Sequence, residues 1–235
     1  MKTRLAAALV IEIVLLLSVS LAQQSSLLTD PDAERILDKA AQAEGGDNVL
    51  TALRTLHMKG SIYWGSTSSP HVQGDIESVI KFPDKFHDIF LGLNGSTLNY
   101  GFDGTEAWTR STGGQRSTGL PRLQILLPAA QWRLRYAEAR FLGQRKIGKR
   151  LVYVIRALVH GQATPADYYY DAADYLLLQV DTNSKTPPIT YRVSNFQEIS
   201  GLKVPREWSY GANRTVISSI KTNTDIDDSQ FARVK

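Results

Sequence analysis

The residues between 167 and 231 decide the fold of this chain. In order they read Asp167-Tyr168-Tyr169-Tyr170-Asp171, Tyr175-Leu176-Leu177-Leu178, Tyr191-Arg192-Val193-Ser194-Asn195-Phe196, Ser200-Gly201-Leu202-Lys203-Val204-Pro205 and Ile226-Asp227-Asp228-Ser229-Gln230-Phe231. Apolar residues alternate with polar ones in these runs, and tight turns separate them, which is typical of strands joined by hairpins. The pattern predicts a meandering antiparallel sheet that ends in a short acidic motif.

The same alternation extends toward the N-terminus. In the run from Leu56 to Trp64 one face carries apolar residues and the other carries polar ones. Asn94-Gly95 predicts a hairpin, because both residues tolerate a positive φ. We expect about eleven strands, with no strand-helix-strand crossover, and short connections favour antiparallel neighbours. Their predicted ranges are 56–64, 72–82, 85–93, 98–102, a strand around Trp108, 151–159, 167–171, 176–180, 189–196, 202–210 and 215–221.

Two regions have a helical period. Thr29-Asp30-Pro31 can cap a helix that Gly45-Gly46 ends, and a second short helix is expected from Asp47 or Asn48 to Leu53. Between Leu120 and Leu142 the apolar spacing again suits helices, which indicates a helical insertion between two halves of the sheet. A large sheet curls, so we expect the helices to fill its concave side. The fold class is therefore mainly β with helices (α+β).

The first 22 residues have the pattern of a secretory signal. A charged start precedes a short apolar run from Leu5 to Leu17, and small residues precede a cut after Ala22. A retained signal anchor is the alternative. Residues 1–22 are thus expected to be a signal peptide and residues 23–235 a single domain. We expect the mature protein to be exported through the cleaved signal and to be periplasmic.

Composition narrows the function classes. The chain has no cysteine, which excludes disulfides, thiolate metal sites and thiol catalysis. Its net charge of +4 is mild, and no basic stripe with interleaved aromatics argues for nucleic acid. The densest basic run, Arg145 to Arg150, is expected to be a solvated hairpin.

Motifs for catalysis or cofactor binding are absent from the sequence. The four histidines lie at wide spacings, so we expect no metal site, and there is no nucleophile elbow, P-loop or dinucleotide fingerprint. The pair Asp227-Asp228 could serve as an acid/base dyad or as a pair of calcium ligands, but capping of the last segment is the better interpretation. We therefore expect no enzyme activity and no cofactor.

Several short motifs occur in an order that resembles the LolA-like outer-membrane lipoprotein-sorting proteins. They are Glu44-Gly45-Gly46, Phe82-Pro83-Asp84-Lys85-Phe86, the turn from Phe102 to Trp108, Tyr169-Tyr170-Asp171 with Leu176, and the closing motifs from Ser200 and from Ile226. The resemblance spans about residues 40 to 235. It implies an incomplete antiparallel β-barrel with helices on the concave side, around an apolar cavity.

The resemblance also implies a function. A LolA-like half-barrel at residues 23–235 would be a monomeric periplasmic carrier of lipoprotein acyl chains or another lipid. Its partners would be an inner-membrane transporter and an outer-membrane acceptor. A lipid-sensing or envelope-stress interaction module on the same fold is the alternative. The family's lid is latched by a first-strand arginine, whereas the run from Leu56 to Trp64 has Lys59 as its only Lys or Arg.

The candidate ligand-binding residues are large apolar side chains on the expected inner face. Ordinary core packing is the alternative role for each of them. They are Met58, Ile62, Trp64, Ile76, Ile80, Phe90, Leu126, Trp132 and Trp208.

Overall fold

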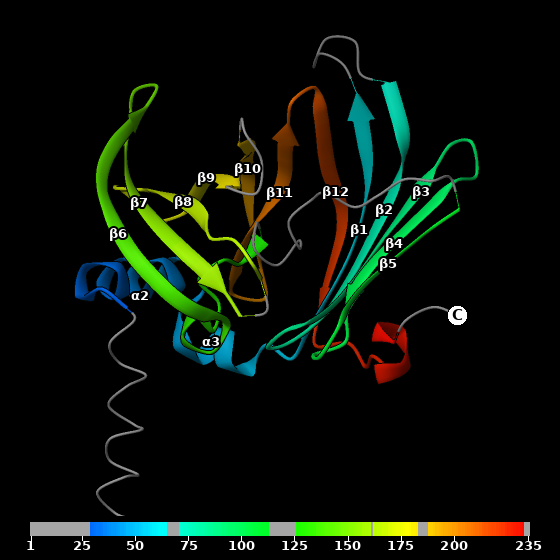
Figure 1. The fold of residues 1–235 in the computed structure, drawn as a ribbon, viewed down its shortest axis with the longest axis horizontal. Helices are drawn as coiled ribbons and strands as arrows, with labels where there is room; N and C mark the ends of the chain where they lie inside the picture. The colour runs from blue at the N-terminus through cyan, green and yellow to red at the C-terminus, as the bar shows by residue number, and fades with distance from the viewer. Residues whose placement is uncertain (1–28, 65–70, 113–125, 161, 183–187, 233–235) are drawn as a thin grey trace, which may run out of the picture.

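The computed structural model describes residues 29–64, 71–112, 126–160, 162–182 and 188–232. Within these ranges twelve strands form one antiparallel sheet in the order β5-β4-β3-β2-β1-β12-β11-β10-β9-β8-β7-β6 (Figure 1). The strands are β1 (Thr55–Trp64), β2 (His71–Lys81), β3 (Lys85–Gly92), β4 (Thr97–Phe102), β5 (Ala107–Ser111), β6 (Tyr136–Ile147), β7 (Arg150–Val159), β8 (Ala166–Asp171), β9 (Leu177–Thr182), β10 (Ile189–Ile199), β11 (Leu202–Tyr210) and β12 (Asn213–Thr222).

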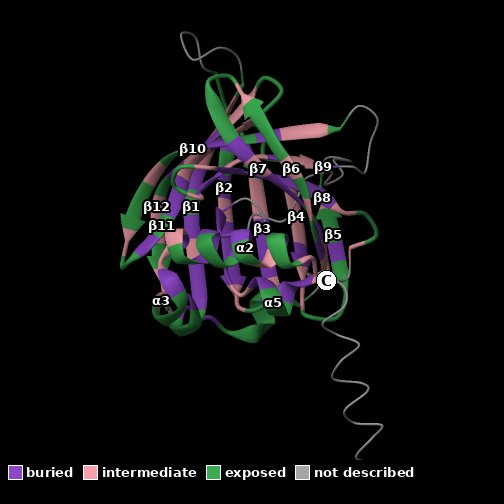
Figure 2. Cartoon of the chain, turned by 90° about the vertical axis from the view of Figure 1, so that its left-hand side faces the viewer, coloured by how far each residue is buried: buried purple, intermediate pink, exposed green. Residues whose placement is uncertain are grey.

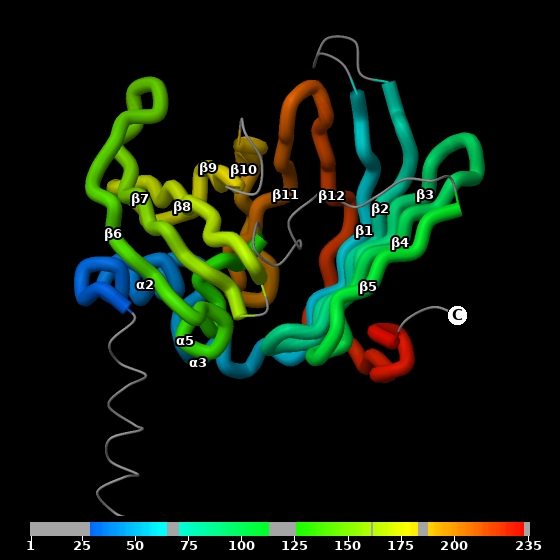
Figure 3. The backbone as a smooth tube through the Cα atoms, viewed as in Figure 1, coloured from blue at the N-terminus to red at the C-terminus, as the bar shows by residue number. Residues whose placement is uncertain are grey.

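The sheet curls into an incomplete barrel. β5 and β6 stand at the two ends of the strand order, and the described residues show no pairing between them (Figure 3). The free edge of β6 is partly covered, because Thr29 bridges Ala139 and the N–H of Asp30 donates to the carbonyl of Ala139 at 3.0 Å. Such cover reduces the tendency of an open edge to pair with another chain.

The N-terminal helices form where the cap and glycine signals predicted. In α2 (Pro31–Glu44) the carboxylate of Asp30 accepts from the N–H of Asp32 at 2.8 Å. The chain turns at Gly45, where φ is 150° and an added Cβ would lie 2.8 Å from the carbonyl oxygen of Gly201. α3 (Gly46–Ala52) follows at once. Gly45 is therefore required by both conformation and space.

One face of α2 packs into the core. Its buried apolar residues recur at helical spacing, and the opposite face is exposed (Figure 2). They share one cluster with residues from strands in both halves of the sheet, so the helices pack on the concave side as expected. This cluster includes Ile36, Leu37, Leu56, Met58, Ile80, Tyr168, Tyr191 and Trp208.

The insertion between the sheet halves differs from the prediction. In its described part, from residue 126, the longest helix is α5 (Trp132–Arg135), and β6 begins at Tyr136. Residues 136–142 contain good helix formers, but pairing of β6 with β7 overrides that local preference. Buried Ala139 lies opposite buried Ala157 in this pair. The described residues therefore form twelve strands rather than about eleven. The basic run from Arg145 to Arg150 lies in the exposed β6–β7 hairpin.

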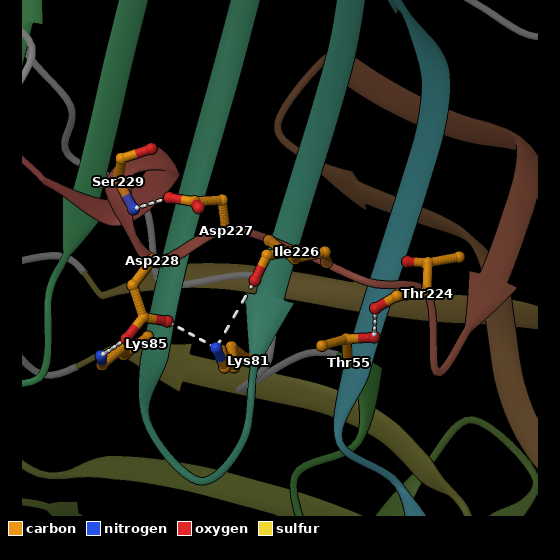
Figure 4. Close-up of polar contacts among 8 residues, drawn as sticks. All are labelled: Thr55, Lys81, Lys85, Thr224, Ile226, Asp227, Asp228 and Ser229. Atoms are coloured by element: carbon orange, nitrogen blue, oxygen red, sulfur yellow. Dashed lines mark hydrogen bonds and ion pairs between the residues drawn. The ribbon is translucent and has the colours of Figure 1, made fainter.

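The acidic closing motif caps the last segment, as expected. Asp227 accepts from the N–H of Ser229 at 2.8 Å at the start of the 3-10 helix η1 (Asp228–Phe231) (Figure 4). Asp228 bridges Lys81 and Lys85 at 2.5 and 2.9 Å.

A second set of contacts fixes the same segment to the outer face of the sheet. Phe231 is fully buried with Val79 and Ile226 in a cluster separate from the main core. The indole N–H of Trp108 donates to the carbonyl of Phe231 at 2.8 Å. The turn motif that ends at Trp108 and the closing motif thus meet in one structural contact.

Candidate functional site

A pocket of about 510 Å³ lies at the opening of the barrel. One wall comes from the β2–β3 turn and the adjoining ends of β3, β4 and β5, and the other comes from α5 and the end of β7. The pocket therefore lies between two parts of the barrel that are not paired with each other. Its lining residues are Pro83, Asp84, Phe86, Tyr100, Phe102, Gly104, Thr105, Ala107, Leu134, Arg135, Val159, His160 and Gln162.

Three aromatic rings make the sheet-side wall. Phe86 lies opposite Phe102 in the β3–β4 register, with ring centroids 6.3 Å apart, and its ring is 5.2 Å from that of Tyr100. These separations are normal for packed aromatic pairs. Burial, with the nearby charge of Asp88, raises the pKa of Tyr100, so its hydroxyl stays neutral at physiological pH.

Leu134 stands out on the opposite wall. Its side chain is 66% exposed although it lines an otherwise partly apolar pocket. The N–H of His160 donates to the carbonyl of Arg135 at 2.9 Å, which ties the end of β7 to α5. An exposed leucine at the mouth of a pocket is suited to contact with an apolar ligand.

Arg135 is the buried cation of the pocket. Only 4% of the residue is exposed. Its Nη1 donates to the carbonyls of Leu127, Pro128 and Ala130 at 2.8, 3.3 and 3.1 Å. The arginine thereby holds the chain segment before α5 in place.

A buried carboxyl group lies behind this segment. The Oε1 atom of Glu44 accepts from the N–H of Ala129 at 3.1 Å, and Oε2 has no hydrogen-bond partner. Burial raises the pKa of Glu44 to about 8, against the opposing effects of the Ala129 N–H and the charge of Arg135. Glu44 is therefore mostly protonated at neutral pH.

Arg133 joins α5 to α2 on the surface. Its guanidinium contacts Glu34 at 2.7 Å and Asp38 at 2.6 and 2.9 Å. The indole of Trp132 donates to Asp38 at 3.1 Å. Partial burial pushes the pKa of Asp38 up, but the hydrogen bonds from Arg133 and Trp132 outweigh it and hold that pKa below its usual range.

None of the nine residues predicted to bind ligand lines this pocket. Met58, Ile76, Ile80, Leu126, Trp132 and Trp208 are buried in the main core. Ile62 and Phe90 are half-buried, and Trp64 is 52% exposed at the end of β1. Their role in binding stays a prediction.

The pocket residues that sequence reasoning missed had a detectable signal. Phe86 and Phe102 flank the turns at residues 83–84 and 103–106, which belong to two of the motifs that resemble LolA-like proteins. Aromatic residues on one face at strand ends beside turns are candidates for a barrel mouth. Arg135 carried no such signal, because its burial depends on the position of residues 127–130.

Metal chemistry has little support among the described residues. No group of three or more histidine, aspartate or glutamate side chains gathers there in a metal-binding arrangement. His57 contacts Glu77 at 2.5 Å and His87 contacts Asn99 at 3.1 Å.

None of the helices in the described ranges is long and apolar enough to cross a membrane. The predicted signal at residues 1–22 lies outside the described residues.

Comparison with known proteins identifies the fold. No protein-family model matches the sequence, and no curated protein matches it. A LolA superfamily protein from Nitrosomonas europaea matches in structure with a TM-score of 0.57 and 14% identity, over 86% of this chain and 97% of that one.

Two other solved structures agree. A putative outer membrane lipoprotein-sorting protein domain from Vibrio parahaemolyticus has a TM-score of 0.54 at 10% identity, over 85% of this chain and 97% of that one. A DUF1329 family protein from Desulfovibrio piger has a TM-score of 0.54 at 11% identity, over 86% and 97%. The chain has a LolA-like fold, and at these identities the likeness shows the fold alone.

Proposed function

We propose that this protein is a periplasmic carrier that binds an acyl chain of a lipoprotein, or of another lipid, in the pocket at the barrel opening. The observation that carries the proposal is a partly apolar pocket, lined by three aromatic rings and an exposed leucine, on a LolA-like fold. Under this proposal the mature domain is residues 23–235, exported through a cleaved signal and acting as a monomer without catalysis.

The size of the pocket supports one chain. Its volume of about 510 Å³ lies within the range of about 300–1,000 Å³ for small-molecule sites. Each buried methylene contributes about 0.8 kcal/mol. Ten buried methylenes would give about 8 kcal/mol, the free energy of a dissociation constant of about 1 μM. Loss of chain freedom weakens this value, which suits a carrier that must also release its ligand.

Leu134 provides a direct test. A Leu134→Glu variant places a charge at the pocket mouth, and we expect it to weaken binding of an acyl chain about tenfold or more. The fold is expected to tolerate the change, because Leu134 is 66% exposed. Binding is measured by isothermal titration with dodecanoate and dodecanol below their aggregation concentrations.

Leu93→Glu is the matched control. Leu93 is 73% exposed in the β3–β4 turn and does not line the pocket. We expect wild-type binding in this variant. Equal effects of the two substitutions would contradict the proposed location. Absence of binding to both ligands in the wild type would contradict acyl carriage.

The proposal includes two transfer partners for the carrier. An inner-membrane transporter would supply the ligand and an outer-membrane acceptor would take it. The envelope-stress module differs in its expected complex, because it would bind a signalling protein stably without ferrying a chain. Pull-down from the exported fraction with wild-type protein and Leu134→Glu separates these two cases. Only carriage predicts that the protein passes from one partner to the other when a ligand occupies the pocket, so that Leu134→Glu changes which partner is captured.

A further inference from the structure

The pocket contains a buried positive charge without an anionic partner. Arg135 is 4% exposed and lines the pocket. Among the described residues its hydrogen-bond acceptors are three backbone carbonyls, all contacted by Nη1. Among the described residues no carboxylate lies within ion-pair distance of this guanidinium. A guanidinium has five N–H donors, and the three carbonyls contact Nη1 alone.

The nearby acids do not neutralise this charge. Glu44 is the buried acid behind the segment that Arg135 holds, and burial raises the pKa of Glu44 to about 8. It is thus mainly a neutral carboxylic acid at pH 7. Asp84 also lines the pocket but is exposed, so water and salt screen its charge. Arg135 remains the dominant buried charge at the site.

A buried unpaired cation is costly and gains from an anion that reaches it. A carboxylate suits this position, because its two oxygens match the fork of N–H groups on a guanidinium. The apolar surface of the same pocket comes from Phe86, Tyr100, Phe102 and Val159. An anionic head and a single hydrocarbon tail therefore have complementary surfaces in one pocket.

We propose that the preferred ligand is a single-chain carboxylate amphiphile, a free fatty acid, with its head on Arg135 and its tail along the aromatic wall. This inference rests on the proposed function and names the ligand class of the same site. It assigns Arg135 a second role beside its three contacts with the segment at residues 127–130.

Three ligands with one tail and different heads test the proposal on wild-type protein. They are dodecanoate, dodecanol and dodecyltrimethylammonium, titrated below their aggregation concentrations at one salt concentration. We expect dodecanoate to bind about tenfold or more tightly than dodecanol, since hydrogen bonds to charged groups are the strong ones. The ammonium is expected to bind more weakly than the alcohol, because it would meet Arg135 with a like charge.

The outcomes distinguish the two proposals. Equal affinity for dodecanoate and dodecanol would overturn the assignment of the head group and leave acyl carriage standing. Tighter binding of the ammonium would also overturn it. Absence of binding by all three ligands would overturn carriage as well.

An Arg135→Lys variant adds a second readout. It keeps the charge but removes the bidentate fork, so the ratio of the dodecanoate affinity to the dodecanol affinity is expected to fall several-fold. A purely structural arginine would instead change the affinity for both ligands equally. Thermal unfolding of the variant checks its fold, and the wild-type series decides the question if the variant does not fold.

Discussion

Replacing Glu44 with glutamine is expected to remove a large pH dependence of stability. The carboxyl group is fully buried at the end of α2, and only its Oε1 atom has a hydrogen-bond donor, the N–H of Ala129. Glutamine keeps an oxygen for that N–H and carries no charge at any pH. The substitution therefore isolates the cost of ionising this one group.

The magnitude follows from the pKa. Burial raises the pKa of Glu44 to about 8 from an ordinary value of 4.5. Between these values the folded protein keeps the proton that the unfolded chain has lost, so stability falls as the pH rises. Each pH unit in that window costs about 1.4 kcal/mol. The whole window costs about 5 kcal/mol, which is an upper limit because the folded site can relax around the charge.

Urea unfolding of wild type and Glu44→Gln from pH 5 to pH 9 measures this effect. The wild type is expected to lose stability from pH 5 to about pH 8 and to level off toward pH 9, and the variant to lose much less, so that it becomes the more stable protein at pH 9. Glu34→Gln on the exposed side of α2 is the control and is expected to follow the wild type. Parallel pH profiles for wild type and Glu44→Gln would refute the reasoning.

Three further substitutions test the packing of the C-terminal segment and the contact between α5 and α2. Phe231→Ala is expected to lower the free energy of unfolding by about 3–5 kcal/mol, because Phe231 is fully buried. Asp228→Asn is expected to leave the urea midpoint nearly unchanged, because its ion pairs are exposed. A larger loss in Asp228→Asn than in Phe231→Ala would contradict the outer-face packing. Arg133→Gln is expected to cost about 1 kcal/mol or less at pH 7. The pKa of Asp38 is held low in the folded protein, so the stability from this contact is present above the ordinary aspartate pKa and is lost as the pH falls through the folded pKa. Unfolding measured between pH 5 and pH 2 should therefore show a smaller loss of stability in the variant than in the wild type.

Local signals predicted the elements that depend on near neighbours. The cap at Asp30, the turn at Gly45 and the hairpin at Asn94-Gly95 each involve residues a few positions apart, and each occurs in the structure. The alternation of most other strands was visible because one face packs against the core, although all six residues of β8 are buried. The curl of the sheet followed from the number of strands and their short connections, whereas the incomplete barrel was implied by the resemblance to LolA-like proteins.

Elements that depend on distant partners were harder to predict. β6 contains helix-forming residues, and its strand conformation comes from pairing with β7. The pocket combines the β3–β5 region with α5 and the end of β7, which are far apart in sequence. Large apolar residues such as Met58 and Trp208 pointed to the inner face in general, but packing buried them in the core. Apolarity alone does not distinguish a core residue from a pocket residue.

Native mass spectrometry of the protein purified gently from the exported fraction tests acyl carriage most directly, with lipid extraction of the same sample. A single bound species of acyl-chain mass, lost in Leu134→Glu and retained in Leu93→Glu, is the predicted result. A bare polypeptide mass in all three proteins, unchanged after incubation with dodecanoate, would contradict the account.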